Sequence, residues 1–305
     1  MNEPVAVLCS DLHLCHTPPT ARSAEPDWYA AMGRCLSQLG ELADGKPVIC
    51  GGDVFDRWNP PPRLINFALL HLPHPFYTVY GQHDLPYHNT SLSDFTGLYT
   101  LVESGKVHHL YPGSQTFVDN PSGGIDIKGF DWGEGLEGPE HPIPGSGLAM
   151  LVAHRYVWKP GCSYPGAPDT GKVSGLKKSL AGYELALFGD NHIPFIASAG
   201  NCQVVNPGCL IPRKQDERKH GGNVALLYSD GSAELKKLDD SKDVWLDEDE
   251  TVIYTDRDME HLVQTMRELA ADSLDFRKLV ERYIDENDMD VMVRELLLKS
   301  LEVEQ

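Results

Sequence analysis

Five short apolar runs stand out in the first part of the sequence, and each ends abruptly in polar residues or glycine. The runs are Val5–Ser10, Val48–Cys50, Phe76–Tyr80, Leu148–Ala153 and Leu185–Phe188. Continuous apolar runs of this length are typical of strands that are buried on both faces of a sheet. The sequence therefore predicts a sheet with covered faces, whose strands end in groups that can do chemistry.

Helical spacing of apolar residues separates the first three runs. It spans Asp27–Leu42, and it recurs over Leu64–Leu69 after three consecutive prolines. This alternation of strand and helix predicts an α/β fold with helices packed on the faces of a sheet. In open α/β sheets ligands gather at the carboxyl ends of the strands, which is where the polar residues fall.

Two further strands are expected at Gln203–Val205 and Asn223–Tyr228, without a long helix between them. We expect them in a second, more antiparallel sheet. Three stretches rich in glycine and proline interrupt the pattern at 132–147, 159–175 and 207–222. Because loops this long in a compact domain usually line a site, we expect these stretches near the ligand.

The acidity of the chain is concentrated near its C-terminal end. The formal charge is −19 over 305 residues, and residues 231–305 carry 22 acidic against 10 basic side chains. Apolar residues recur at helical spacing between Leu262 and Leu297. The sequence thus predicts a main domain over 1–238 and an acidic helical appendage over 239–305. Since the overall field is negative, any polyanionic substrate has to be held by local groups, metal ions or a partner chain.

No apolar stretch is long enough to span a bilayer, and the N-terminal residues lack the pattern of a secretory signal. The seven cysteines include no CxxC pair, which favours small buried thiols in a reducing compartment over disulfides or zinc fingers. We therefore expect a cytoplasmic protein without membrane segments.

Each of the five strand ends delivers a carboxylate, an imidazole or an amide. A single such residue usually caps a turn, but five in succession indicate a shared site. Carboxylates and imidazoles without thiolates suit divalent manganese, iron, zinc or magnesium, and seven donors suit two ions. Two ions about 3.5–4 Å apart activate water for attack on phosphorus, which predicts phosphoester hydrolysis. The residues at these strand ends are Asp11, His13, Asp53, Asp56, Gln82, His83, Asp84, His154, Asp190, Asn191 and His192.

The motifs DxH, GDxxD, GxHD, a lone histidine and GxxH occur here in the order found in calcineurin-like metallophosphoesterases, which the sequence resembles over residues 5–230. The resemblance implies a four-layer α/β/β/α sandwich. It implies a first metal held by Asp11, His13, Asp53 and His192, and a second completed by Gln82, His154 and Asp190, with Asp53 shared. It also implies that His83 is the general acid and that Asp84 orients its ring.

Two residues depart from the family's motifs, and both concern the second metal. Gln82 stands where asparagine is usual, and Asp190 stands where histidine is usual. Gln82 keeps an amide oxygen on a longer stem. Asp190 adds an oxygen donor and a negative charge, which shifts the expected preference from zinc toward manganese or magnesium.

The residues around the motifs resemble SbcD-type nuclease subunits of DNA repair. The similar segments are 52–56, 83–89 and 206–217. This resemblance implies a manganese-dependent DNA exonuclease and endonuclease, paired with a coiled-coil ATPase of the SbcC type. A basic and aromatic loop over 159–178 suits a nucleic-acid backbone and an unpaired base. Further candidates for substrate binding are His88, Arg57 and Arg213.

Two other functions stay open at this point. The metal motifs equally permit a small-molecule phosphoesterase acting on a nucleotide, a nucleotide-sugar diphosphate or a phosphomonoester. A scaffold that keeps the fold to recruit partners is the third, although the presence of His83 speaks against it. An exposed apolar face on the predicted C-terminal helices would provide a partner groove or a homodimer contact.

Overall fold

The computed structural model describes residues 3–246 except 113, 120–122 and 137–146. These residues belong to a compact unit that extends to Leu246. The unit therefore continues past the boundary at 238 that the sequence predicts. The amphipathic helices predicted between Leu262 and Leu297 lie outside the described residues.

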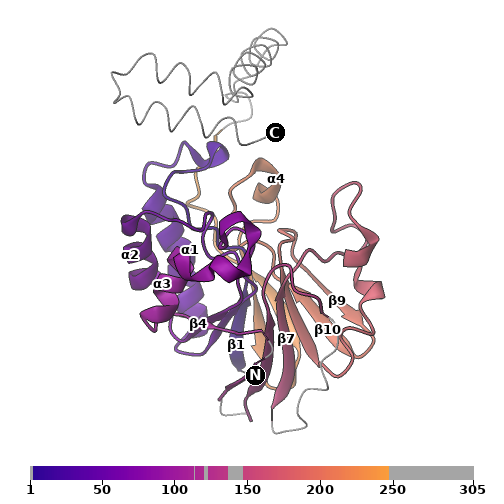
Figure 1. Ribbon diagram of the computed structural model, residues 1–305. Coiled ribbons are helices and arrows are strands. Elements are labelled where there is room, and N and C mark those ends of the chain that lie inside the picture. Colours follow the sequence, from indigo (N-terminus) through magenta and orange to yellow (C-terminus); the bar gives the residue numbers. More distant parts are fainter. Residues whose placement is uncertain (1–2, 113, 120–122, 137–146, 247–305) are drawn as a thin grey trace, which may run out of the picture. The chain divides into compact units, whose positions relative to one another are not determined.

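Two six-stranded sheets face each other in this unit (Figure 1). The first sheet has the order β12-β11-β1-β2-β3-β4 and the second has the order β5-β6-β7-β8-β10-β9. The five apolar runs expected from the sequence form β1, β2, β3, β7 and β8. The strands of the first sheet are β1 Pro4–Cys9, β2 Val48–Cys50, β3 Phe76–Thr78, β4 His108–His109, β11 Asn223–Tyr228 and β12 Ala233–Lys237. Those of the second are β5 Gln115–Val118, β6 Ile125–Phe130, β7 Leu148–His154, β8 Leu185–Gly189, β9 Phe195–Ala199 and β10 Cys202–Asn206.

Each sheet has a parallel centre with antiparallel strands at its margin. In the first, β1 to β4 are parallel, while β11 and β12 are antiparallel neighbours on the other side of β1. In the second, β6, β7, β8 and β10 are parallel, and β5 and β9 close the two edges. The parallel arrangement brings the carboxyl ends of β1, β2 and β3 to one end of their sheet, and those of β7 and β8 to one end of theirs.

The predicted placement of β10 and β11 in one shared sheet was wrong. β10 runs parallel to β8 in the second sheet, whereas β11 pairs antiparallel with β1 in the first. The reason is the hairpin that precedes β11. β9 and β10 pair antiparallel, and β10 lies between β9 and β8 in the second sheet. The loop between β10 and β11 consequently crosses from one sheet to the other.

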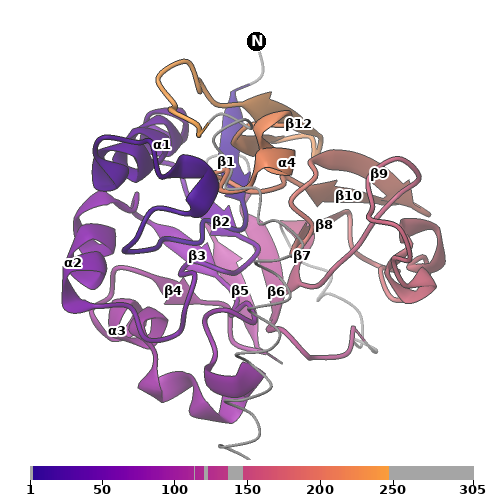
Figure 2. The same ribbon diagram turned by 90° about the horizontal axis from the view of Figure 1, so that it is seen from above.

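Helices cover the outer face of the first sheet (Figure 2). They are α1 Trp28–Ala43, α2 Pro62–His71 and α3 Gly97–Glu103, and the first two occur where the apolar spacing predicts them. α1 begins after Asp27, whose side chain accepts a hydrogen bond from the Ala30 N–H. The alternation of β1 shows the layering, because Val7 and Cys9 pack toward the helices while Ala6 and Leu8 pack between the sheets.

The outer face of the second sheet is covered differently. Leu151 and Phe188 pack there against Val173, Leu176 and Leu180. These residues come from a segment with two 3₁₀ turns, η4 Asp169–Gly171 and η5 Val173–Gly175. The fourth layer of the predicted sandwich is thus built from short turns within the described residues. Among all the residues that the structure describes, no helix is long and apolar enough to cross a membrane.

Candidate active site

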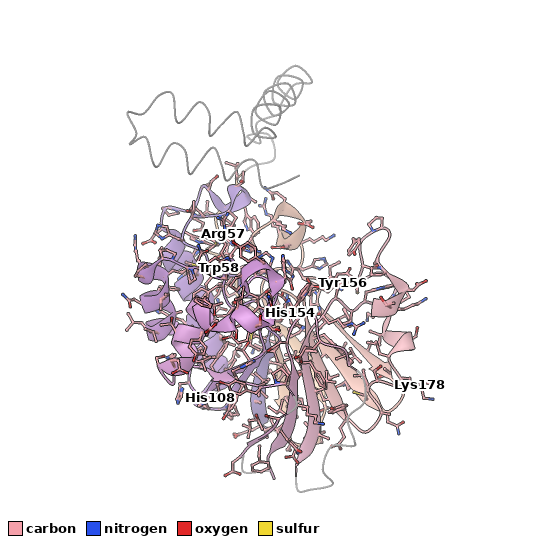
Figure 3. All side chains as sticks on the ribbon, in the orientation of Figure 1. Arg57, Trp58, His108, His154, Tyr156 and Lys178 are labelled. Carbon is pink, nitrogen blue, oxygen red and sulfur yellow. The ribbon has the colours of Figure 1, made fainter. Side chains whose placement is uncertain are left out.

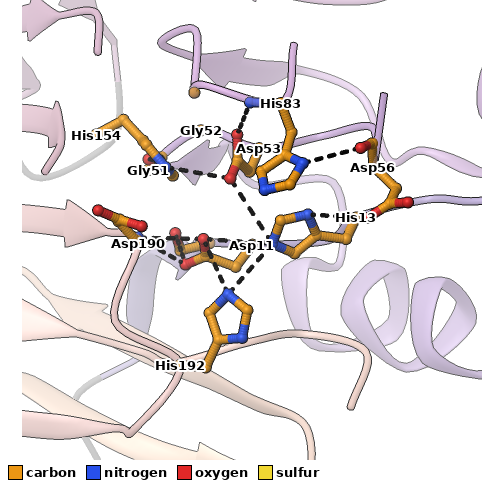
Figure 4. A network of polar contacts seen from close by, with 12 residues as sticks. Asp11, His13, Gly51, Gly52, Asp53, Asp56, His83, His154, Asp190 and His192 are labelled. Atoms are coloured by element: carbon orange, nitrogen blue, oxygen red, sulfur yellow. Dashed lines mark hydrogen bonds and ion pairs between the residues drawn. The ribbon is translucent and has the colours of Figure 1, made fainter. Parts of the chain in front are cut away.

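The carboxyl ends of β1, β2, β3, β7 and β8 converge on one polar cluster (Figure 4). Asp11 and His13 follow β1, Asp53 follows β2, and His154 is the last residue of β7. The two sheets therefore contribute to the same site.

The backbone is strained at several of the predicted ligands. A positive φ is uncommon for any residue except glycine, and such strain gathers at functional sites. Backbone hydrogen bonds between the loops hold this conformation: Asp11 N–H donates to Gly52 O at 3.1 Å, and His13 N–H donates to Asp53 O at 2.9 Å. The φ angles are 51° at Asp11, 44° at His13, 53° at Asp53 and 82° at Asp190.

Two glycines make room for these side chains. A Cβ on Gly81 would lie 2.0 Å from Asp53 Oδ1, and one on Gly52 would lie 2.5 Å from His154 Nδ1. Gly52 also has a φ of +99°, which an L side chain rarely adopts. The glycines of the GGD and GQHD segments are therefore required by close packing around the ligands.

A first group of donors is formed by Asp11, His13, Asp53 and His192. The Nε2 atoms of His13 and His192 are 3.2 Å apart. His13 Nε2 lies 3.8 Å from Asp11 Oδ1 and 3.7 Å from Asp53 Oδ2, and His192 Nε2 lies 3.7 Å from Asp11 Oδ1. These separations suit donors that surround one ion at about 2 Å.

A second group shares Asp53 with the first. His154 Nε2 lies 3.3 Å from Asp53 Oδ2, and Asp11, Asp53 and His154 offer three ligand atoms within 4.8 Å of one another. The Nδ1 atom of His154 lies 2.6 Å from Gly51 O, so it carries the proton of the neutral ring. Nε2 is left as the lone-pair donor that faces the cluster.

Gln82 and Asp190, the two departures from the family's motifs, contact each other. Gln82 Nε2 donates to Asp190 Oδ1 at 2.9 Å, while Gln82 Oε1 is buried without a hydrogen-bond partner. Asp190 N–H in turn donates to the Asp11 carboxylate at 3.1 Å. The Asp190 carboxylate is thus held by the amide of Gln82, and the two substitutions form one structural unit.

The electrostatics of the cluster favour a bound cation. Burial lowers the pKa of His13 well below 6.5, which keeps this ring neutral. Burial alone would also lower the pKa values of His154 and His192, but both are raised instead. Asp53 has the largest opposing effect on His154, and Glu217 has it on His192. The carboxylates therefore draw positive charge into a buried site.

The donor set fits two divalent ions, because several of its buried atoms have no hydrogen-bond partner. Asp53 Oδ2, Gln82 Oε1 and His154 Nε2 all lack one, and unpaired buried polar atoms are costly. Asp11, His13, Asp53 and His192 would hold one ion, while Asp53, Gln82 and His154 would hold the other. Asp190 would support the second ion directly or through Gln82.

His83 is exposed beside the first group and is oriented by the backbone. Its Nδ1 lies 2.9 Å from Asp56 O, and its ring meets that of His13 edge to face at 4.8 Å. Because a carbonyl oxygen only accepts, Nδ1 carries the proton of the neutral ring, and Nε2 is its lone-pair nitrogen.

The predicted role of Asp84 in orienting His83 was wrong. The Asp84 carboxylate is fully buried and accepts hydrogen bonds from the N–H groups of Val54, Phe55 and Gly81 at 2.9–3.2 Å. Burial and the neighbouring Asp53 raise the pKa of Asp84 to about 8. Asp84 therefore joins the loops after β2 and β3, and it acts on the site through their positions.

Glu217 is a functional residue that the sequence did not reveal as such. It lies in α4 Gln215–Arg218, a single turn in the loop between β10 and β11. Its Oε1 lies 2.6 Å from His192 Nδ1, and its Oε2 accepts from the N–H groups of Arg213 and Lys214. Burial alone would raise the pKa of Glu217, but His192 and these N–H groups lower it to about 2. A carboxylate behind a ligand histidine fixes its ring orientation and tautomer.

The candidates for substrate binding are distributed around the site. Arg213 forms an ion pair with Asp56, while Arg57 is exposed and has no hydrogen bond or ion pair among the residues that the structure describes. His88 is exposed, and its ring packs against Trp132 at 5.2 Å.

A cleft of about 790 Å³ opens above the metal ligands. Tyr156 and Tyr164 line it from the loop after β7, and Arg213, Lys214 and Lys219 line it from the loop before β11. Both loops thus line the site as predicted. The structure does not describe 137–146 of the third stretch.

The basic side chains of the 159–178 loop do not gather at this cleft. Lys159 Nζ donates to Ile196 O at 3.1 Å, and Lys172 lies 5.5 Å from the centre of the Trp158 ring. Lys178 points away from His154 and Tyr156 (Figure 3). That these lysines neutralise a bound backbone stays a prediction, and packing against strand β9 and Trp158 engages two of them. The positive side chains of the cleft come from the β10–β11 loop.

Comparison with known proteins assigns the chain to a family. The family model described as calcineurin-like phosphoesterase matches residues 5–194, which include every predicted metal ligand. The chain belongs to this family and is a metal-dependent phosphoesterase hydrolase of the dimetal type. A search of curated proteins finds no significant match.

Solved structures with a similar fold share little sequence with this chain. The phosphopantetheinyl hydrolase of Mycobacterium tuberculosis is 14% identical, with a TM-score of 0.45 over 72% of this chain and 93% of that one. A novel archaeal phosphodiesterase is 12% identical, with a TM-score of 0.38 over 76% and 99%. The protein TT1561 of Thermus thermophilus is 13% identical, with a TM-score of 0.43 over 76% and 97%.

Proposed function

We propose that the protein is a phosphodiesterase that cleaves DNA, as SbcD-type nucleases do. The observation that carries this proposal is the composition of the cleft walls. The rings of Tyr156 and Tyr164 pack against each other at 5.0 Å, and both line the cleft together with Arg213, Lys214 and Lys219. Aromatic rings suit an unpaired base, and cationic side chains suit the phosphate backbone. Their combination supports a nucleic-acid strand over a simple phosphomonoester.

The residues around the metals have distinct tasks in this reaction. The two ions, when bound, polarise the phosphoryl group and supply an activated water nucleophile. His154 and His192 have their tautomers fixed by Gly51 O and Glu217, so that their Nε2 atoms face the metals. His83 acts as the general acid in its imidazolium form, in which Nδ1–H donates to Asp56 O and the second proton, on Nε2, is given to the leaving oxygen.

We further propose manganese as the metal of the second position. Asp53 and Gln82 offer oxygen donors there, and the Asp190 carboxylate adds negative charge through its contact with Gln82. Oxygen donors favour manganese or magnesium over zinc. Activity that is highest with zinc after removal of all metals would contradict this assignment.

The experiment that tests the proposed function compares several substrates with Mn²⁺ present. End-labelled duplex DNA and single-stranded DNA are incubated with the protein beside a nitrophenyl phosphodiester and a nitrophenyl phosphomonoester. His83→Ala is the control for a contaminating nuclease. Shortening of DNA or loss of its label with wild type alone supports the proposal. Cleavage of only the small esters refutes it.

One observation favours a second candidate, a small-molecule phosphoesterase. The cleft volume of about 790 Å³ lies within the range of about 300–1,000 Å³ typical of small-ligand sites. A nucleotide or a nucleotide-sugar diphosphate would fill it with the base against Tyr156. In the substrate experiment described above, this candidate predicts that the small esters are hydrolysed and that DNA stays intact. The SbcC-type ATPase partner, which the resemblance to SbcD-type subunits implies, and a homodimer stay predictions, because the C-terminal helices predicted to contact another chain lie outside the described residues.

A further inference from the structure

A second crevice lies next to the catalytic cleft and shares one lining residue with it. It has a volume of about 370 Å³ and is lined by Cys15, His16, Thr17, Arg57 and Asn59, among others. Asp56 lines both the crevice and the cleft. The two cavities are therefore neighbours at Asp56.

The crevice holds an available guanidinium group. Arg57 is exposed and makes no hydrogen bond, ion pair or ring contact within the described part of the chain. Arg213, by contrast, is paired with Asp56 and so offsets the charge of the carboxylate nearest to Arg57. A free guanidinium offers a fork of N–H donors that matches the oxygens of a phosphate group. The side chains around it include the amide of Asn59 and the imidazole of His16, which also donate to anions.

The position of His83 indicates which part of the substrate reaches this crevice. His83 is held by Asp56 O at 2.9 Å, and it lies beside His13 on the side of the first metal group. The leaving oxygen has to lie at His83 to receive its proton. Arg57 follows Asp56 directly in the chain, with Cα atoms about 3.8 Å apart. Because Asp56 holds His83 and also lines the crevice with Arg57, the crevice lies on the side of the leaving oxygen. Arg57 is labelled in Figure 3.

We propose that this crevice is a subsite for a phosphate carried by the leaving group, and that Arg57 binds this phosphate. The inference rests on the proposed function, because a leaving group with its own phosphate is what a nucleic-acid strand or an oligonucleotide provides. Arg57 is then a specificity-determining residue. It favours diesters whose leaving nucleoside bears a second phosphate over diesters of a simple alcohol or phenol.

The test uses competition, so that it works whether or not DNA proves to be cleaved. Hydrolysis of a nitrophenyl phosphodiester is inhibited with dinucleotides that carry a terminal phosphate at the 5′ end, at the 3′ end, or at neither. Wild type is expected to bind one of the phosphorylated forms at least about 10-fold more tightly than the form without terminal phosphate, as a charge-assisted hydrogen bond allows. Arg57→Ala is expected to reduce this ratio to about one.

Two further variants separate a specific contact from general charge. Arg57→Lys keeps the charge but loses the fork, and it should give an intermediate ratio. Arg63→Ala removes an exposed arginine of α2 that lies 4.3 Å from the Tyr29 ring centre, and it should keep the wild-type ratio. A wild-type ratio of one, or an unchanged ratio in Arg57→Ala, overturns the subsite. If DNA stays intact but the affinity ratio between phosphorylated and unphosphorylated dinucleotides depends on Arg57, only the proposed function is overturned.

Discussion

Replacement of Glu217 by glutamine tests how a carboxylate that contacts His192 positions this metal ligand. In wild type Glu217 Oε1 accepts a hydrogen bond from His192 Nδ1–H at 2.6 Å, which leaves Nε2 free to face Asp11 and His13. The glutamine amide has nearly the same shape and can keep its oxygen on the N–H groups of Arg213 and Lys214. Its NH₂ group then faces His192 Nδ1 and donates to it. The neutral ring responds by moving its proton to Nε2, where it blocks the metal.

The size of the effect follows from the role of such supporting carboxylates. Their loss typically lowers metal affinity or activity by about 10- to 100-fold, which corresponds to about 1.4–2.7 kcal/mol. The second ion is expected to be affected less, because its ligands Gln82 and His154 do not contact Glu217. The fold is expected to be preserved, since the backbone hydrogen bonds to the side-chain oxygen remain.

Calorimetric titration of the metal-stripped variant with Mn²⁺ measures the two affinities separately. Nitrogen chemical shifts of the His192 ring report the tautomer directly. Asp216→Asn is the matched control, because it removes a carboxylate from the same turn on an exposed side chain. Unchanged affinity at both sites in Glu217→Gln, with Nδ1 still protonated, would refute this reasoning.

Three other predictions concern catalysis and stability. His83→Ala should lower turnover of a phosphodiester by about 10²–10⁴-fold without changing Mn²⁺ binding, and a variant that retains full turnover would show that another group is the acid. Arg22 is buried against Glu25, Asp243 and Pro212 O, so Arg22→Met should lower the free energy of unfolding in urea by about 3–5 kcal/mol, and a loss under 1 kcal/mol would contradict this. Burial alone would raise the pKa of Glu25, but Arg22 and the Val244 N–H lower it below 4.5. Its contribution to stability is therefore complete above about pH 4.5 and is lost as the pH falls through its folded pKa, so the metal-free wild type should lose stability in acid more steeply than Glu25→Gln.

The ligands could be predicted from the sequence because each lies within a few residues of the end of a buried apolar run. Asp11 and Asp53 follow β1 and β2 closely, and His154 ends β7. Parallel strands bring such ends together whatever the connecting segments do. The strands could be located because both of their faces are buried. The first two helices could be located because one stripe of each is buried.

The supporting residues could not be predicted, because they depend on contacts between distant segments. Glu217 lies 25 positions from His192, on a helix of four residues that no periodicity reveals. The family resemblance implied that Asp84, the neighbour of His83 in the chain, orients the His83 ring. The turn instead directs the carboxylate toward the N–H groups after β2. Sequence adjacency is a poor guide where the chain turns tightly.

The lysines of the 159–178 loop illustrate a further limit. Their spacing among aromatic residues is the same whether they face a ligand or pack on their own domain. The structure shows that Lys159 reaches Ile196 O and that Lys172 lies near the Trp158 ring. The basic side chains of the cleft are those of Arg213, Lys214 and Lys219, whose segment crosses between the two sheets. That crossing follows from the pairing of β10 with β8, which local sequence does not determine.

The most direct test of the dimetal phosphoesterase is the metal dependence of phosphodiester hydrolysis in wild type and Asp53→Asn. Asp53 is shared by both donor groups, with Oδ2 lying 3.7 Å from His13 Nε2 and 3.3 Å from His154 Nε2. Metal-stripped wild type should be inactive, and activity should rise to a plateau as two equivalents of Mn²⁺ bind. Asp53→Asn should bind neither ion tightly and should stay inactive. Hydrolysis by the stripped protein in the presence of a chelator, or undiminished hydrolysis by Asp53→Asn, would contradict the account.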